Sequence, residues 1–402
     1  MSRMRVLDSS IMFVFIGTVL MYTDFGQTAQ GIKLVGQAVG MVVLLKQFDW
    51  RDYWHINLIW GGQTVWPLIL VAVGIYTSHQ QTIVMFAIFA AFQLLWATMI
   101  GKYFSTNPGT LLRLCQKCLL GVLTLMCIIH RTVIWRIDQL FVGMMTNTRY
   151  GDQAVGRTSL MFVNVNALGI FATLLAVISL WFIFKRDARI RDWFGIVLAA
   201  VLILNAGSRA ALVVTVLATL WLKSHSGIKK FLVGTLISIL FCYTALLITN
   251  NHGGFALMLD DLSSHRISFG QTAVHSMFTQ TTGLVGNGPV GTAYAAEHLF
   301  KYLGGIAVDN TVAFVIYSTG ILGIIWFVTM SGWLIAQTIA PVARYLLFVI
   351  GSYAVFEHVW LVPSAPLSVM LLPVILGVMN GKEKRGNQSI GCDTDLQSSK
   401  RS

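Results

Sequence analysis

Long hydrophobic runs separated by short polar stretches dominate the pattern of residues along the chain. Each run is near 20 residues long, which is the length that crosses the hydrocarbon core of a bilayer as an α-helix. The pattern therefore predicts an all-α, polytopic membrane protein with about 12 membrane-spanning helices. We expect these spans at residues 9–24, 29–45, 56–76, 82–101, 115–135, 161–184, 193–206, 210–222, 231–248, 310–335, 346–360 and 366–380.

The polar segments between the runs predict how the chain is organised. Residues 1–380 form a single transmembrane domain, and the first run lacks a small-residue cleavage site, so we interpret it as a span. Two external loops, about 136–160 and 249–309, are long enough to hold a functional site. The tail 381–402 is polar and without aromatic residues, which predicts a disordered cytoplasmic tail.

Composition agrees with the membrane assignment, and the distribution of charge adds an orientation. Only 11% of the 402 residues are charged, whereas a soluble domain carries about a quarter. The net charge of +12 does not indicate nucleic acid, because most of the 28 Lys and Arg residues fall on one side of the predicted spans. That side is cytoplasmic by the positive-inside rule, so both termini are expected to be cytoplasmic. The expected external cations are Arg131, Arg136, Arg149, Arg157, Arg209, Arg266 and Lys301.

Arginine predominates among the external cations, and topology alone does not require arginine there. Arg149 and Arg157 lie in the first long loop, Arg209 lies at the tip between two short spans, and Arg266 lies in the second long loop. The guanidinium group offers a rigid fork of donors that matches phosphate oxygens in pairs. Converging arginines at the outer face would suit a lipid-linked diphosphate. The alternative is that each one extends to the membrane surface or pairs with a loop carboxylate such as Asp152.

Asp309 is a carboxylate directly before a long apolar run. It is followed by Asn310 and then by no charged residue until Arg344. One interpretation is a helix cap that accepts N–H bonds from the first turn. The other is a general base at the membrane surface that takes a proton from a sugar hydroxyl.

Metal and cofactor sites have little support in the sequence. Cys115 and Cys118 form a single CxxC at the start of a predicted span, and we interpret them as small apolar helix residues. The histidines of the second long loop lack paired ligand spacing, and no glycine-rich phosphate loop follows a strand. We therefore expect no metal and no cofactor.

The segment DNTVAFVIYSTGILG, residues 309–323, resembles the signature of bacterial O-antigen ligases and the related Wzy-type O-antigen and capsule polymerases. The ligase signature is His, then Asn, Ser or Gln, nine residues, Gly, two residues, and Gly, Thr or Tyr. Asn310, Gly320 and Gly323 fit it, whereas Asp309 replaces the histidine. The two glycines fall on one side of the span, where small residues would permit close helix packing.

Three further stretches support the resemblance, in family order and on one predicted side. NAGSRAALVV is similar to the Ser-Arg-Gly/Ala helix start, and RISFGQTAVHSMFTQTTGLVGNGPVG is similar to the Arg-led external segment that ends in Gly-x-Gly. GRTSLMFVNVNALG is similar to a stretch with Asn-Pro-Asn before a span, with Val165 in place of the proline. The resemblance covers residues 149–325; the first 130 residues share only their hydrophobic spans.

The resemblance implies a metal-independent glycosyltransferase of the GT-C kind in the inner membrane of a Gram-negative bacterium. Such enzymes move a glycan from undecaprenyl diphosphate to an acceptor hydroxyl at the periplasmic face. The catalytic residues by position are Asp309, Arg209 and Arg266, and the substrate-binding residues are Arg149, Arg157, Asn166 and Asn310.

The aspartate at position 309 favours the polymerase branch, in which lipid-linked repeat units are joined into O-antigen or a related polysaccharide. The alternative is a ligase that transfers the glycan to lipid A-core, and a lipid-linked glycan flippase is a third possibility. The expected partners are the undecaprenyl-diphosphate-linked glycan, membrane lipid, a chain-length regulator and a flippase, and no nucleic acid.

Overall fold

A computed structural model describes residues 3–47, 59, 61–75, 80–131, 133, 135, 138, 157–224, 283–286, 288, 311–354, 356–357 and 365–379. Within these ranges the chain is helical and contains no β-strand; Thr23 and Phe162 form an isolated antiparallel bridge. The predicted all-α class is thereby confirmed for the described part of the chain. The predicted span 231–248 and the tail 381–402 lie outside the described residues.

The helices fall on the predicted hydrophobic runs. They are α1 (Arg3–Leu20), α2 (Gly26–Leu44), α5 (Trp66–Ala72), α6 (Gln80–Tyr103), α7 (Pro108–His130), α9 (Val165–Phe184), α10 (Ile190–Ala206), α11 (Arg209–Lys223), α16 (Thr311–Gln337), α17 (Pro341–Ala354) and a last helix, Pro366–Met379. A short 3₁₀ turn, Leu45–Gln47, follows α2, and a π-helix, Gly61–Val65, leads into α5.

Several predicted boundaries are wrong, and proline explains two of them. The first helix begins at Arg3, although its span was predicted from residue 9, and no proline accounts for that difference. The span predicted at 115–135 is a helix that begins at Pro108, and the span predicted at 346–360 begins at Pro341. Proline suits the first turn of a helix because its missing N–H has no intrahelical partner there. Both helices therefore start about a turn or more before the hydrophobic run. Arg113 and Arg344, which the sequence placed in loops, lie inside helices.

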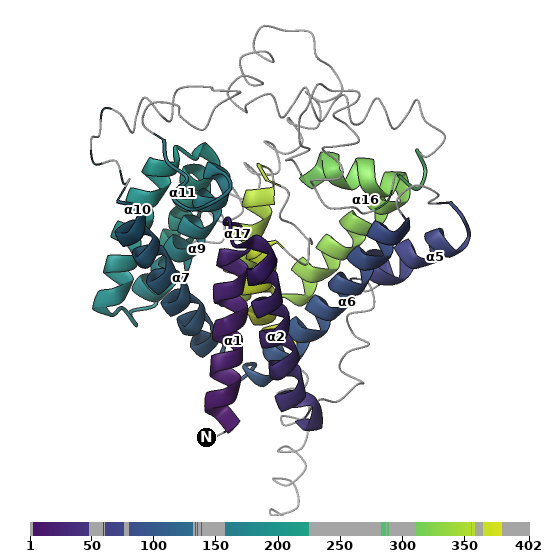
Figure 1. Cartoon of the computed structure of the whole chain (residues 1–402), viewed down its shortest axis with the longest axis horizontal. Helices are drawn as coiled ribbons and strands as arrows, with labels where there is room; N and C mark the ends of the chain where they lie inside the picture. Colours follow the sequence, from purple (N-terminus) through teal and green to yellow (C-terminus); the bar gives the residue numbers. More distant parts are fainter. Residues whose placement is uncertain are drawn as a thin grey trace, which may run out of the picture.

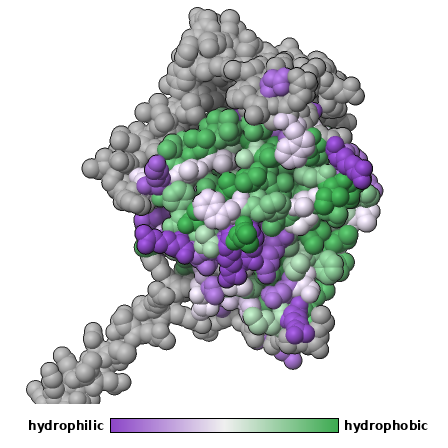
Figure 2. Space-filling model, turned by 90° about the vertical axis from the view of Figure 1, so that its left-hand side faces the viewer, coloured by the Kyte–Doolittle hydropathy of each residue, from purple (hydrophilic) through white to green (hydrophobic). Residues whose placement is uncertain are grey.

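Four described helical segments are long and apolar enough to cross a membrane: Gln80–Tyr103, Pro108–His130, Val165–Phe184 and Tyr317–Gln337. Three shorter apolar helices are Gly61–Ala72, Pro341–Ala354 and Pro366–Met379. These segments show an α-helical membrane protein. Figure 2 shows the corresponding surface on one side of the molecule, where hydrophobic side chains form a broad band and hydrophilic ones gather below it.

The helices run back and forth between two ends of the molecule (Figure 1). The antiparallel pair α1 and α2 stands near the middle, with α7, α9, α10 and α11 on one side and α5, α6 and α16 on the other. Close packing of α1 and α2 depends on Gly36, where an added Cβ would lie 2.9 Å from the carbonyl oxygen of Ser10. The chain's N-terminus marks one end; the N-termini of α9, α11 and α16 lie at the other, which we call the outer end.

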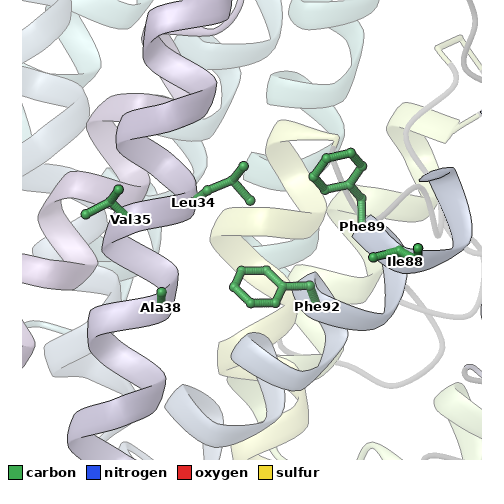
Figure 3. A pocket seen from close by; sticks show the side chains of 6 residues that line it. All are labelled: Leu34, Val35, Ala38, Ile88, Phe89 and Phe92. Atoms are coloured by element: carbon green, nitrogen blue, oxygen red, sulfur yellow. The ribbon is translucent and has the colours of Figure 1, made fainter.

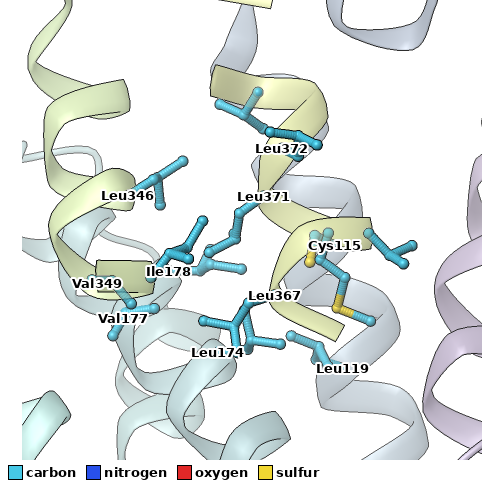
Figure 4. Packing of buried hydrophobic residues seen from close by; sticks show 14 of the residues in the cluster. Cys115, Leu119, Leu174, Val177, Ile178, Leu346, Val349, Leu367, Leu371 and Leu372 are labelled. Carbon is cyan, nitrogen blue, oxygen red and sulfur yellow. The ribbon is translucent and has the colours of Figure 1, made fainter. Parts of the chain in front are cut away.

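The core lies between α7, α9, α17 and the last helix (Figure 4). Cys115 of α7 is fully buried there, in one cluster with leucine and valine side chains from the other three helices. Cys118 is also buried, so both members of the CxxC pack as apolar residues. Tyr345 links α17 to α9, because its hydroxyl donates to the carbonyl of Val177 at 3.0 Å. This packing connects α7, α9, α17 and the last helix in one core.

Candidate functional site

A tight turn between α10 and α11 fixes the position of Arg209 at the outer end. Gly207 ends α10 in the left-handed conformation at φ 57°, and Ser208 then caps α11 by accepting the N–H of Ala211 at 3.3 Å. Arg209 is the first residue of α11. Gly169 of α9 lets this turn approach closely, since an added Cβ would lie 2.6 Å from the Ser208 hydroxyl. The predicted break between two short helices is confirmed, and it fixes the backbone of Arg209.

The segment before α9 folds back onto the same turn and brings in Arg157. The Nε of Arg157 donates to the carbonyl of Ala206 at 3.1 Å, and the N–H of Thr158 donates to the carbonyl of Asn205 at 2.8 Å. These are two of the carbonyls that the C-terminus of α10 leaves without intrahelical partners. Arg157 and Arg209, which are 52 positions apart, thereby come together at one end of the bundle.

Like charges face each other in this pair. Burial, and after it the neighbouring guanidinium of Arg209, lower the pKa of Arg157 below its usual value. Both causes disfavour the charged form, as expected for a cation that is desolvated next to another cation. Within the described part of the chain, Arg157 forms no ion pair with a carboxylate. An anion bound between the two guanidinium groups would relieve both penalties.

Asn164 and Asn166, the two asparagines of the VNVN stretch, have different environments. Asn164 caps α9, and its side-chain oxygen accepts the N–H of Ala167 at 2.8 Å. Asn166 lies in the first turn of α9, is partly exposed, and makes no hydrogen bond to another described residue. A structural role therefore accounts for Asn164, whereas Asn166 stays available to a ligand near the two arginines.

The other side of this segment is anchored on the turn between α1 and α2. The N–H of Val163 donates to the carbonyl of Tyr22 at 2.9 Å, and the ring of Phe162 stacks on Phe171 with centroids 5.4 Å apart. Tyr22 also meets Phe171 edge to face at 5.7 Å. The arginine pair is thus held by contacts to α1, α9, α10 and α11, and its positions are set by packed helices.

The signature helix α16 is broken at Gly320. This residue has φ 63° and ψ −158°, a backbone conformation that is essentially restricted to glycine, and the two parts of α16 meet there at an angle (Figure 1). The hydroxyls of Ser318 and Thr319 bond back to the carbonyls one turn earlier, at 2.6 and 2.7 Å, which favours bending. The expected close helix packing at Gly320 is wrong, because Gly320 faces a loop segment.

That segment, residues 283–286 and 288, belongs to the long loop predicted at 249–309, and we call it the strap. Its carbonyls at Gly283 and Leu284 accept the N–H groups of Ile321 and Leu322 at 3.3 and 3.2 Å. The N–H of Gly288 in turn donates to the carbonyl of Ser318 at 2.9 Å. The strap therefore supplies hydrogen-bond partners for the backbone at the break in α16.

Close backbone approach explains the glycines of the strap and of the signature. A Cβ on Gly286 would lie 2.5 Å from the backbone of Ser318, and a Cβ on Gly320 would lie 2.6 Å from the carbonyl oxygen of Leu284. Gly323 is different, since its Cβ would collide with the Thr319 side chain of its own helix. The Gly-x-Gly and the first signature glycine, Gly320, belong to separate motifs in the sequence and meet in one contact in the structure.

We expect Gly320→Ala to lower the free energy of unfolding by about 2–4 kcal/mol, because it adds backbone strain to a steric clash. Thermal or denaturant unfolding in detergent would measure the change. Gly332→Ala is the matched control: it lies in the same helix with no atom within 4 Å of the added Cβ, so it should change stability by less than about 0.5 kcal/mol. Equal stability of the Gly320 variant and wild type would show that the strap does not restrict this position.

The first turn of α16 is tied to the segment after α17. The Thr311 hydroxyl donates to the carbonyl of Glu357 at 2.8 Å, and both residues are buried. Glu357 is therefore placed close to the start of α16. The predicted site residues Asp309, Asn310, Arg149 and Arg266 lie outside the described residues.

The sequence missed a buried polar network at the opposite end. Arg113 of α7 donates to Asp192 of α10 at 2.5 Å, and Gln116 bridges Asp192 to the Ser179 hydroxyl of α9 at 2.6 and 2.9 Å. The guanidinium of Arg113 also stacks over the Phe182 ring, 3.3 Å from its centroid. Lys33 of α2 is buried as well, at 6% exposure. The sequence counted Arg113 only as a marker of orientation and placed Lys33 within a predicted span, on neither side.

Other parts of the described chain offer little for catalysis. A hollow of about 410 Å³ between α2 and α6 is lined only by apolar residues (Figure 3), namely Leu34, Val35, Ala38, Ile88, Phe89 and Phe92. Among the described residues, no group of three or more His, Cys, Asp and Glu side chains is placed to hold a metal ion. The arginine pair and the start of α16 are therefore the features most suited to chemistry.

Comparison with known proteins finds no family model and no curated protein that matches the chain. The resemblance to O-antigen ligases and polymerases therefore rests on the motifs themselves.

Proposed function

We propose that this membrane protein is a Wzy-type polymerase, which joins undecaprenyl-diphosphate-linked repeat units into O-antigen or a related polysaccharide at the periplasmic face. The observation that carries the proposal is the arginine pair: Arg157 and Arg209 are held together at the outer end by the α10–α11 turn. Two guanidinium groups at a membrane surface match the oxygens of a diphosphate.

In the proposed reaction, a hydroxyl oxygen of the acceptor sugar attacks the anomeric carbon of the donor. The new glycosidic C–O bond forms as the C–O bond to the diphosphate breaks, and the bonding electrons leave with undecaprenyl diphosphate. Asp309 takes the proton from the hydroxyl, and Arg209 with Arg157 and Arg266 stabilises the charge on the leaving group. Asn166 and Asn310 would bind the glycan.

The proposal also includes the number of membrane spans and their orientation. Twelve spans with both termini cytoplasmic, in a bacterial inner membrane, place the N-termini of α9, α11 and α16 on the periplasmic side. The placement of these three N-termini at one end of the molecule agrees with this orientation (Figure 1). A GT-C-like arrangement needs no metal and no nucleotide sugar, because the lipid diphosphate is the leaving group.

The glycans of a deletion strain test the proposal. A polymerase mutant loses long chains and keeps a single repeat on the core. Loss of all repeats from the core would instead identify a ligase, and repeat units trapped on the cytoplasmic face would identify a flippase. Gel analysis of the surface glycan and extraction of lipid-linked units distinguish the three outcomes.

We expect Asp309→Asn to reduce chain extension by about 10²- to 10⁴-fold while the protein still accumulates in the membrane. Asparagine caps a helix about as well as aspartate, so a pure capping role would leave activity unchanged. The matched control is Asp24→Asn, which removes an exposed carboxylate from the turn between α1 and α2. Glycan chain length and protein abundance are measured in parallel, and normal chains in the Asp309 variant would exclude it as the base.

A further inference from the structure

The turn between α9 and α10 gathers cations at the end opposite the arginine pair. Lys185, Arg186 and Arg189 are exposed, and Arg191 is partly exposed in the first turn of α10. We call these four residues the basic turn. Figure 2 shows the molecule from this side, with hydrophilic side chains gathered below the hydrophobic band.

The carboxylates beside the basic turn are already used by another residue. Asp192, fully buried, pairs with Arg113 at 2.5 Å, and Asp187 pairs with the same guanidinium at 3.1 Å. The second oxygen of Asp192 accepts the backbone N–H of Arg189 at 2.6 Å. Within the described residues, the side chains of the basic turn form no ion pair. Asp192 and Asp187 also act on Arg191, but two carboxylates face the four cations of the basic turn and Arg113, so a net positive charge remains there.

Arg191 has a side-chain donor that is not satisfied within the described residues. Its Nε is buried and has no hydrogen-bond partner in the described part of the chain. Burial first, and then the neighbouring Arg113 and Arg189, lower the pKa of Arg191, while Asp192 and Asp187 act in the opposite direction. An anion beside this guanidinium would favour its charged form.

Exposed apolar residues continue from the basic turn along one face of α10. Ile190, Trp193, Phe194 and Val197 are 89%, 58%, 49% and 61% exposed, and their spacing places them on the same side of the helix. Lys185 lies over the Trp181 ring, 5.0 Å from its centroid. Cations beside exposed aromatic and aliphatic residues are typical of a membrane–water interface.

We propose that the basic turn binds the phosphate headgroup of an anionic phospholipid, whose acyl chains lie along the exposed face of α10. Arg186, Arg189 and Arg191 contact the phosphate through their terminal guanidinium nitrogen atoms. This proposal is independent of the proposed polymerase activity. It assigns the cations a specific ligand in addition to their role in orienting the chain.

Native mass spectrometry of the purified full chain tests the proposal, with phosphatidylglycerol and phosphatidylcholine of identical acyl chains as probes. The triple variant Lys185→Gln, Arg186→Gln, Arg189→Gln should bind phosphatidylglycerol about 10- to 100-fold more weakly than wild type, given the contribution of each interfacial cation. The control triple variant Arg5→Gln, Lys46→Gln, Lys223→Gln removes three exposed cations from elsewhere and should bind it like wild type.

Three results would overturn the proposal: unchanged phosphatidylglycerol affinity in the first triple variant, equal affinity of wild type for both lipids, or displacement of the lipid by inorganic phosphate at the same concentration. The last result would indicate a site for free anions. If the triple variant does not accumulate, the single variant Arg189→Gln decides in the same assay, with an expected loss of about fivefold.

Discussion

The Arg209→Lys variant should extend polysaccharide chains about 10²- to 10³-fold more slowly than wild type, although the side chain keeps its positive charge. Removing one well-placed donor from a site that stabilises a leaving group has an effect of this size. Arg209 begins α11 directly after the Ser208 cap, which packs against Gly169, so its backbone is fixed. A lysine there would offer a single ammonium group instead of the forked guanidinium.

Extension of a purified lipid-linked repeat unit in detergent or nanodiscs measures this effect directly. Arg131→Lys is the matched control, because Arg131 is an exposed arginine at the end of α7, outside the α10–α11 turn, and its replacement should leave the rate unchanged. A wild-type extension rate in the Arg209→Lys variant would show that position 209 needs only a positive charge and not a guanidinium group. A loss of protein from the membrane would indicate a folding role instead.

The Asp192→Ala variant should lower the free energy of unfolding by about 3–5 kcal/mol, the usual cost of removing one partner from a buried ion pair. Asp192 is fully buried, and its loss leaves the guanidinium of Arg113 without its short partner at 2.5 Å. It also removes the acceptor that Gln116 uses to connect α7, α9 and α10.

The matched control is Asp187→Ala. Asp187 pairs with the same arginine at 3.1 Å, but its side chain is 60% exposed, so its loss should cost no more than about 1 kcal/mol. Denaturant unfolding in detergent, followed by circular dichroism, compares the two variants. An equal decrease in the free energy of unfolding of the two variants would show that burial does not determine the strength of this network.

Local signals made the helices predictable from the sequence. Hydrophobic runs located every described helix, and Gly207 with Ser208 marked the turn between α10 and α11. The errors at α7 and α17 arose because helices extend past the membrane-length run when proline supplies a favourable first turn. The number of spans and the enzymatic role of the site residues stay predictions.

Contacts between distant residues were harder to foresee. The sequence predicted converging arginines at the outer face, and the structure places Arg157 beside Arg209. The sequence did not predict that Arg113 would pair with Asp192, because the two residues are 79 positions apart. Each of them alone has the pattern of a charged residue in a loop between two spans. The meeting of Gly286 with Gly320 was missed for the same reason, since a glycine does not reveal which backbone approaches it.

The strap, residues 283–286 and 288, affects the order in which the chain matures in the membrane. A span that entered the bilayer with a broken backbone would expose unpaired N–H and C=O groups to hydrocarbon, at several kcal/mol for each group. We therefore expect α16 to insert as a continuous helix and to acquire its break at Gly320 only when the strap docks on it from outside. Biogenesis of the outer site would then end with an exchange, in which hydrogen bonds within a newly inserted helix are replaced by bonds to a loop that was translocated earlier.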